Sequence, residues 1–158
     1  MSMMQLSSSV FTHNGNMPSR YTCDESDISP PLSWSGIPPQ AKSLVLIVDD
    51  PDAPDPAAPK RTWVDWLLYN LPTHTTSLIE GIQDLPDHTR EGLNDWQRTG
   101  YGGPCPPIGR HRYFFKLYAL DITLDLAGTP TKAELEQAMQ NHVLAQATLI
   151  GMYQRTDK

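Results

Sequence analysis

Residues 43–54 read SLVLIVDDPDAP, and this stretch decides the fold. Its first part, Ser43–Asp49, is a short, continuous run of apolar, β-favouring residues, which is typical of a strand buried on both faces. The carboxylates of Asp50 and Asp52 follow, and prolines then end the strand. Acidic side chains at the exit of a buried strand predict a loop that opens onto a pocket. The same residues also suit a solvated turn in which aspartate caps its own backbone, and the pattern leaves both interpretations open.

Outward from this strand, proline-rich connections alternate with further apolar runs. Prolines cluster in Ser29–Pro39, Pro51–Pro59 and Pro104–Pro107, which are expected to be loops because proline neither donates to a sheet nor continues a helix. Further strands are predicted at Leu32–Trp34, Trp63–Asn70 and Arg112–Leu120. Ala145–Tyr153 suits either a continuation of a helix or a final strand, and the strand is favoured. Non-adjacent strands joined by long loops favour a mainly β, sandwich-like fold in a single domain over residues 1–158.

One or two peripheral helices are predicted, one of them at about residues 131–142. Thr131 is a candidate N-cap, and Glu134, three residues later, completes a capping box. Leu135 and Met139 then recur at helical spacing, so one face of the helix should pack on the protein.

The composition limits the partners and the compartment. A net charge of −6 argues against binding to nucleic acid or to an anionic membrane surface. No apolar run of about 18 residues is present, so no contact with the membrane interior is expected. Met1–Thr12 has neither the basic start nor the apolar core of a secretory signal, which predicts a cytoplasmic protein. In that compartment Cys23 and Cys105 are expected to be reduced thiols, their spacing fits no metal motif, and no cofactor is expected.

A second polar cluster is Trp63-Val64-Asp65-Trp66. In a regular strand Trp63 and Asp65 share one face, and Val64 and Trp66 share the other. Asp65 therefore lies either on the wet side of a sheet, the commoner case for a lone aspartate, or in a cavity beside an indole.

A third cluster is the loop YGGPCPPIG at Tyr101–Gly109, followed by the strand that contains His111 and Tyr113. Glycines let backbone approach a ligand closely, and prolines stiffen the loop. His111 and Tyr113 share a strand face and could donate to a phosphate or carboxylate. In the alternative, His111 is a hydrogen-bonded packing residue, and Arg110 and Arg112 face solvent.

These motifs together resemble the phosphatidylethanolamine-binding protein family, and more closely its bacterial, Raf-kinase-inhibitor-like branch. The resemblance is carried by DPDAP (50–54), WVDW leading into YNLP (63–72), YGGPCPP (101–107) and HRYFFKLYALD (111–121). SPPLSW (29–34) and the C-terminal segment from residue 131 to residue 153 extend it over nearly the whole chain. It implies a β-sandwich of two antiparallel sheets with a small anion pocket at one end. By the same resemblance the ligand-binding residues are Asp50, Asp65, Gly103, Pro104, Cys105, Pro106, His111 and Tyr113.

Two departures from the family pattern bear on this site. Asp65 stands where the family usually has histidine, so a donor is replaced by a carboxylate and one carboxyl of the pocket could stay protonated. We expect phosphate to bind more weakly than in relatives, or a ligand with a cationic part, such as ethanolamine, to be preferred. Only Arg110 separates Gly109 from His111, a shorter spacer than is common in the family. The family also brings Cys23 close to Cys105, although reduced thiols remain the expectation for the cytoplasm.

The function expected from these features is binding of a small anion or phospholipid headgroup, with a regulatory role and no catalysis. An acid–base hydrolase that uses Asp50, Asp65 and His111 is an alternative, although the sequence shows no nucleophile elbow or phosphate loop. A module that inhibits a kinase or protease partner is another, and a homodimer is suggested by analogy with the branch.

Overall fold

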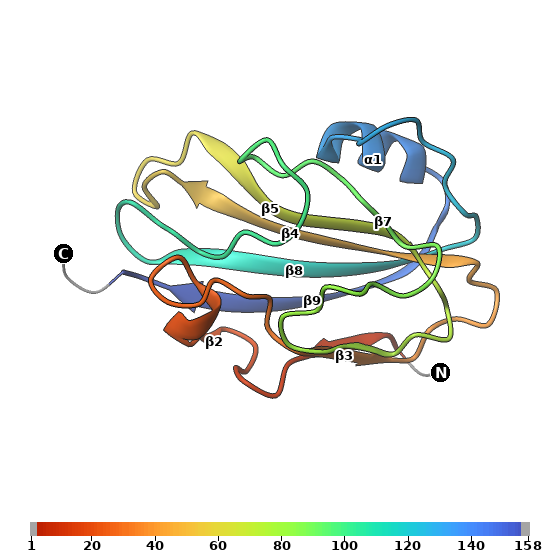
Figure 1. Cartoon of the computed structure of the whole chain (residues 1–158), viewed down its shortest axis with the longest axis horizontal. Coiled ribbons are helices and arrows are strands. Elements are labelled where there is room, and N and C mark those ends of the chain that lie inside the picture. The colour runs from red at the N-terminus through yellow and green to blue at the C-terminus, as the bar shows by residue number, and fades with distance from the viewer. Residues whose placement is uncertain (1–2, 156–158) are drawn as a thin grey trace.

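A computed structural model describes residues 3–155 and contains two β-sheets and one α-helix. The six-stranded sheet has the order β2-β9-β8-β4-β5-β7, and the three-stranded sheet has the order β1-β3-β6. The small sheet lies against one face of the large sheet, and the helix lies on the other (Figure 1). The large sheet comprises β2 (Gly15–Asn16), β9 (Val143–Tyr153), β8 (His111–Leu120), β4 (Ser43–Ala53), β5 (Arg61–Leu71) and β7 (Arg90–Glu91). The small sheet comprises β1 (Gln5–Ser7), β3 (Leu32–Ser35) and β6 (Ser77–Leu78).

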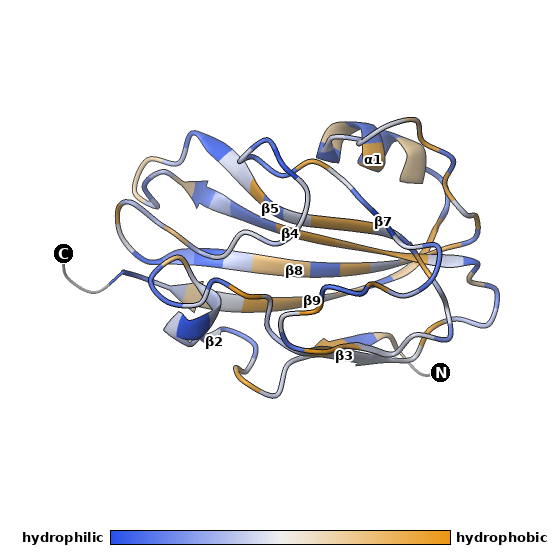
Figure 2. Cartoon of the chain, viewed as in Figure 1, coloured by the Kyte–Doolittle hydropathy of each residue, from blue (hydrophilic) through white to orange (hydrophobic). Residues whose placement is uncertain are grey.

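The predicted mainly β sandwich is confirmed, with the SLVLIVDD segment at its centre. β4 pairs with β5 on one side and β8 on the other, both antiparallel. Because both faces of β4 are covered, Leu44 to Val48 are all buried. Apolar residues are nearly continuous along this part of β4 and β5 in Figure 2, whereas β8 alternates. The strand continues through Ala53, so the DPD aspartates belong to β4 itself rather than to a loop after it.

Two hydrophobic layers follow from this arrangement. Side chains such as Leu46, Trp66 and Phe115 fill the space between the two sheets. Val45, Ile47 and Tyr69 point the other way and pack under the helix. Each fully buried side chain of this size contributes roughly 1.5–3 kcal/mol relative to exposure.

The helix α1 (Lys132–Met139) begins as predicted. Thr131 accepts from the Glu134 amide at 3.2 Å, and Glu134 accepts from the Thr131 amide at 2.9 Å, which forms the capping box. The helix ends three residues before the predicted boundary because Gln140 is extended and Asn141 adopts a positive φ of 69°. The chain then enters β9 two residues earlier than expected. A short 3-10 helix, η1 (Ser19–Tyr21), also lies near the N-terminus, and in residues 3–155 no helix has the length and apolarity needed to cross a membrane.

A β-bulge in β5 overturns one expectation from strand alternation. Val48 pairs with Trp66, but the next residue, Asp49, pairs with Val64, so Asp65 is an extra residue. Trp66 consequently packs between the sheets while Val64 packs on the helix side. The prediction that Val64 and Trp66 share a face is therefore wrong.

A disulfide joins Cys23 to Cys105, which corrects the expectation of two free thiols. The two segments are already adjacent, because the Cys23 amide donates to the Pro104 carbonyl at 3.1 Å. The Gly103 amide also donates to Asp27 Oδ1, at 2.7 Å. The cysteines are 82 residues apart, so their spacing in the sequence gave no sign of this proximity. The disulfide fixes the loop at Tyr101–Gly109, called the Gly-Pro loop below, to the N-terminal region.

Candidate functional site

A cavity of about 510 Å³ lies where β4 ends and β5 and β8 begin. This size suits a small molecule. The residues that line it are Asp50, Ala53, Pro54, Lys60, Arg61, Trp63, Asp65, Trp96, Cys105, Pro106, Pro107, His111 and Tyr113. Six of the eight residues predicted for the site therefore meet around one hollow. The other two, Gly103 and Pro104, are buried behind the lining and connect it to the Cys23 segment.

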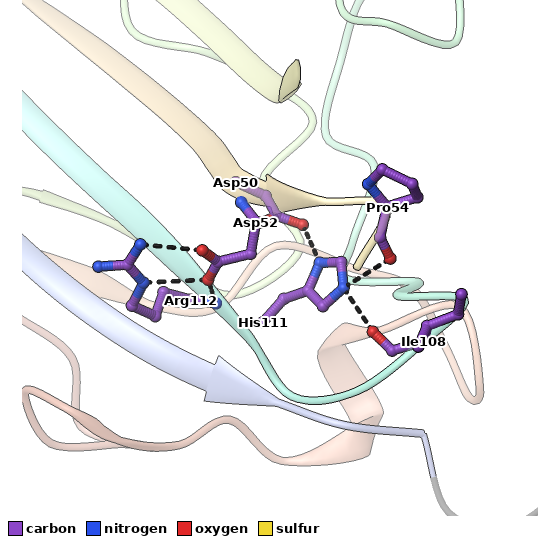
Figure 3. A network of polar contacts seen from close by, with 6 residues as sticks. All are labelled: Asp50, Asp52, Pro54, Ile108, His111 and Arg112. Atoms are coloured by element: carbon purple, nitrogen blue, oxygen red, sulfur yellow. Dashed lines mark hydrogen bonds and ion pairs between the residues drawn. The ribbon is translucent and has the colours of Figure 1, made fainter. Parts of the chain in front are cut away.

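His111 is held entirely by protein groups. Its Nδ1 lies 2.5 Å from Asp50 Oδ2, and its Nε2 lies 2.8 Å from the Ile108 carbonyl and 3.1 Å from the Pro54 carbonyl (Figure 3). Carbonyl oxygens only accept, so we assign a hydrogen to Nε2, and a proton is shared between Nδ1 and Asp50. With both nitrogens engaged and the ring 0% exposed, His111 joins β4 and two loops and has no spare N–H for a ligand.

Two carboxylates at this end of β4, Asp50 and Asp52, have hydrogen-bond partners within the protein. Asp50 also accepts from the Asp52 amide at 2.7 Å, and burial raises its pKa although the His111 hydrogen bond opposes this shift. Arg112 donates to Asp52 through Nε at 3.0 Å and Nη2 at 2.8 Å, and these bonds lower the pKa of Asp52 (Figure 3). Arg112 is thus half exposed but bound, whereas the exposed Arg110 reaches Asn16 at 2.6 Å.

Asp65 contrasts with these groups because nothing in the described chain satisfies it. The residue is 1% exposed, and neither carboxyl oxygen has a hydrogen-bond partner within residues 3–155. Burial raises its pKa well above the ordinary value, and the charges of Asp50 and Asp49 raise it further. Burial thus favours the protonated form of this carboxyl. An unsatisfied buried polar group costs roughly 1–3 kcal/mol, so the fold retains Asp65 here at the expense of stability.

Aromatic side chains form the walls of the cavity. Trp63 and Trp96 meet edge to face with their ring centroids 5.2 Å apart, and the Arg61 guanidinium lies 4.9 Å from the Trp63 centroid. Tyr113 stacks on His111, with the two ring centroids 6.3 Å apart. Burial, followed by the charges of Asp50 and Asp65, raises the pKa of Tyr113, so its phenol stays protonated.

The Gly-Pro loop is placed by Asp65 itself. The Gly102 amide donates to the Asp65 carbonyl at 3.0 Å, so the bulged residue bonds to the loop. A side chain at Gly102 would come within 2.1 Å of the Trp96 ring, which explains the glycine. Because proline has no N–H and the Gly103 amide is used by Asp27, the loop offers the cavity few donors.

The residues of this site that were not predicted from the sequence are Asp52, beside the cavity, and seven that line it: Ala53, Pro54, Lys60, Arg61, Trp63, Trp96 and Pro107. Lys60 and Arg61 lie at the exposed mouth, Trp96 forms a wall, and Asp52 holds Arg112. Asp52 could have been found from the DPD motif, in which it is the second aspartate. No local signal distinguishes Trp96, which reaches the cavity from the loop between β7 and β8.

Comparison with known proteins places this arrangement in a family. The family model described as phosphatidylethanolamine-binding protein matches residues 7–154. The chain belongs to the phosphatidylethanolamine-binding protein family. A UPF0098 protein of Methanothermobacter thermautotrophicus is 51% identical over 155 residues, covering 96% of this chain and 99% of the relative.

Solved structures of the phosphatidylethanolamine-binding protein family agree with the fold. A putative homolog from Chlamydia trachomatis is 42% identical with a TM-score of 0.90, covering 98% of this chain and 99% of the other. YbcL of E. coli, described as a new member of the mammalian family, is 27% identical with a TM-score of 0.87, covering 98% of this chain and 100% of the other. The predicted membership in the bacterial branch of the family is confirmed.

Proposed function

We propose that this protein binds a small ligand with an anionic group, of the phosphate, phosphoethanolamine or phospholipid-headgroup class, and that binding serves regulation rather than metabolism. The observation that carries the proposal is a cavity of about 510 Å³ whose lining includes a buried carboxyl, that of Asp65, without a hydrogen-bond partner among residues 3–155. The cations Lys60 and Arg61 stand at its mouth, where they can hold an anionic group that remains in contact with water. Arg61 also forms an ion pair with Asp95 at 3.0 Å, so Lys60 is the cation more readily available to a ligand.

The chemistry of the lining favours binding over hydrolysis by Asp50, Asp65 and His111. Cys105 is bonded to Cys23 and therefore has no thiolate to act as a nucleophile. Both nitrogens of His111 are engaged by protein groups, so this residue is not placed to activate water.

Regulation would require a macromolecular partner, and a kinase, a protease or a second copy of the chain are the candidates that the family suggests. The cytoplasmic location also stays a prediction. The disulfide argues against it, since such bonds are rare in reducing compartments. Localisation of the tagged protein in cells, with the redox state of Cys23 and Cys105 determined by alkylation, addresses both points.

Calorimetric titration of phosphate, phosphoethanolamine and glycerophosphoethanolamine tests the binding proposal. The double variant Lys60→Gln/Arg61→Gln should weaken phosphoethanolamine binding by roughly threefold to tenfold, because each exposed charge contributes up to about 1 kcal/mol. Lys42→Gln/Arg90→Gln is the matched control, because these cations lie at the opposite end of β4 and β5. The absence of saturable binding for all three ligands would exclude the proposed function.

A further inference from the structure

Asp65 differs from the other buried carboxylates of the large sheet, because each of those has a partner within the protein. Asp49 contacts two lysines, Asp50 contacts His111, and Asp52 contacts Arg112. Four buried side-chain oxygens in residues 3–155 lack any partner, and two of them belong to Asp65. Since Asp65 also lines the cavity, a group that enters the cavity can complete its hydrogen bonds.

The groups around Asp65 determine which chemistry can do this. His111 has no free N–H, and the prolines of the loop have no N–H at all. The neighbouring charges that act on Asp65 are those of Asp50, Asp49, Asp95 and Asp27, all of them negative. The floor is therefore rich in acceptors, poor in donors and electronegative, and it disfavours an anion.

We propose that the floor of the cavity accepts the ammonium group of a small primary amine, with the Asp65 carboxylate as its counter-ion. The inference rests on the proposed function and specifies its ligand as an amine with an anionic end. The ligand enters amine first, and its anionic end stays at Lys60 and Arg61. Two oxygens of Asp65 accept two of the three ammonium hydrogens.

The walls support a cation in this position. The indoles of Trp63 and Trp96 line the path between the mouth and the floor, and a cation near an indole face is stabilised by the ring quadrupole. Arg61 already lies over Trp63 in this way, at 4.9 Å, which shows that the ring accommodates a cation.

Amine binding in this form releases a proton from Asp65. In the proposed step Asp65 starts as the neutral acid, the form that burial favours, and the amine arrives as R-NH₃⁺. On binding, the Asp65 O–H bond breaks, its proton leaves to solvent, and the carboxylate pairs with the ammonium. One proton is released for each amine bound. Other titratable groups that face or act on Asp65 are Asp50 and Asp49 from β4, Tyr113 and His111 from β8, and Asp95, Tyr101 and Asp27 from the loops.

The test is calorimetry of ethanolamine, phosphoethanolamine and inorganic phosphate in buffers of different ionisation enthalpy. For phosphoethanolamine we expect release of about one proton by the native protein and none by Asp65→Asn, which should bind at least tenfold more weakly. Phosphate affinity should be unchanged in Asp65→Asn and should rise in Asp65→His, because imidazole supplies a donor. Asp125→Asn, which removes an exposed carboxylate at the opposite end of the sheet, is the control and should behave as the native protein does.

The outcomes separate this inference from the function on which it rests. If Asp65→Asn binds phosphoethanolamine as well as the native protein does, or binds both phosphate and phosphoethanolamine more tightly, the anionic end occupies the floor and the inference is wrong while the function stands. If no ligand binds the native protein, the function itself fails. Thermal unfolding of each variant identifies any loss of binding that reflects loss of fold.

Discussion

Asp49 and Asp65 lie on neighbouring strands and are both 1% exposed, yet their surroundings differ completely. Asp49 points to the helix side, where Lys116 Nζ lies at 3.0 Å and Lys132 Nζ at 2.7 Å. Asp65 points into the cavity and has no partner in the part of the chain that the structure describes. Burial alone therefore does not distinguish these two carboxyls.

The difference shows what to look for in a buried polar group. The two lysines compensate Asp49 within the protein, so its ion cluster is complete and anchors α1 to the sheet. Asp65 gains a hydrogen-bond partner only if another molecule enters the cavity. An incomplete hydrogen-bond shell, rather than depth, sets Asp65 apart from Asp49.

The largest loss of stability should come from Asp49→Asn. Removing the carboxylate leaves Lys116 and Lys132 close together without a counter-ion, so we expect the free energy of unfolding to fall by about 3 kcal/mol. Denaturant titration measures this change. Ligand affinity should stay within about twofold of native, because Asp49 faces away from the cavity; a loss of binding in a folded variant would contradict the division between the two carboxyls.

Asp65→Asn should raise the free energy of unfolding, whereas Asp49→Asn lowers it. Because the folded pKa of Asp65 is raised, its contribution to stability is fully present below the unfolded value of 3.8 and is lost as pH rises towards the folded pKa. Asparagine does not titrate, so the variant should become more stable than the native protein above about pH 4, by at most about 1.4 kcal/mol per pH unit. Unfolding curves from pH 3 to pH 8 test this, and parallel curves would show that Asp65 ionises normally in the folded protein.

Lys132→Gln should cost less than the loss of Asp49, about 1 kcal/mol, since Lys116 still neutralises the carboxylate. Lys132 is the first residue of α1, so the protection of helix amides from hydrogen exchange should fall more than that of β4. Lys116→Gln is the matched variant on the sheet. An equal loss of helix protection in both variants would contradict a specific anchoring role for Lys132.

Asp52 is the intermediate case, with one partner that is half exposed. Arg112→Gln should lower stability by less than about 1 kcal/mol at neutral pH, because solvent screens the pair. The lowered pKa of Asp52 contributes stability that is present above its unfolded value and lost as pH falls. The native protein should therefore lose more stability than the variant on acidification, and equal losses would exclude the pair as the cause.

The sequence predicts most of the fold because the main elements have strong local signals. The run from Ser43 to Asp49 and the capping box at Thr131 and Glu134 each indicated their element, with errors of a few residues at the ends. The predicted site residues come from three separate motifs, which the structure brings to one cavity. Its residues become neighbours only through strand pairing, as when Asp50 and His111 meet from β4 and β8.

Three features had no local signal. The bulge at Asp65 depends on how β5 pairs with β4, the bond between Cys23 and Cys105 depends on the packing of distant loops, and Trp96 enters from a loop. Alternation along a strand assumes a regular ladder, so it misplaced Val64 relative to Trp66.

The extra residue in β5 also makes this protein unusually sensitive to a change in chain length. With Val48 opposite Trp66, an uninterrupted ladder would set Asp65 directly across from Asp49, on the side of Lys116 and Lys132. Deleting Val64 alone would create that ladder and transfer a carboxyl from the binding cavity to the lysine cluster. Loss of three nucleotides in a gene would thus move this carboxyl from the cavity to the lysine cluster, a change that no single substitution at this strand reproduces.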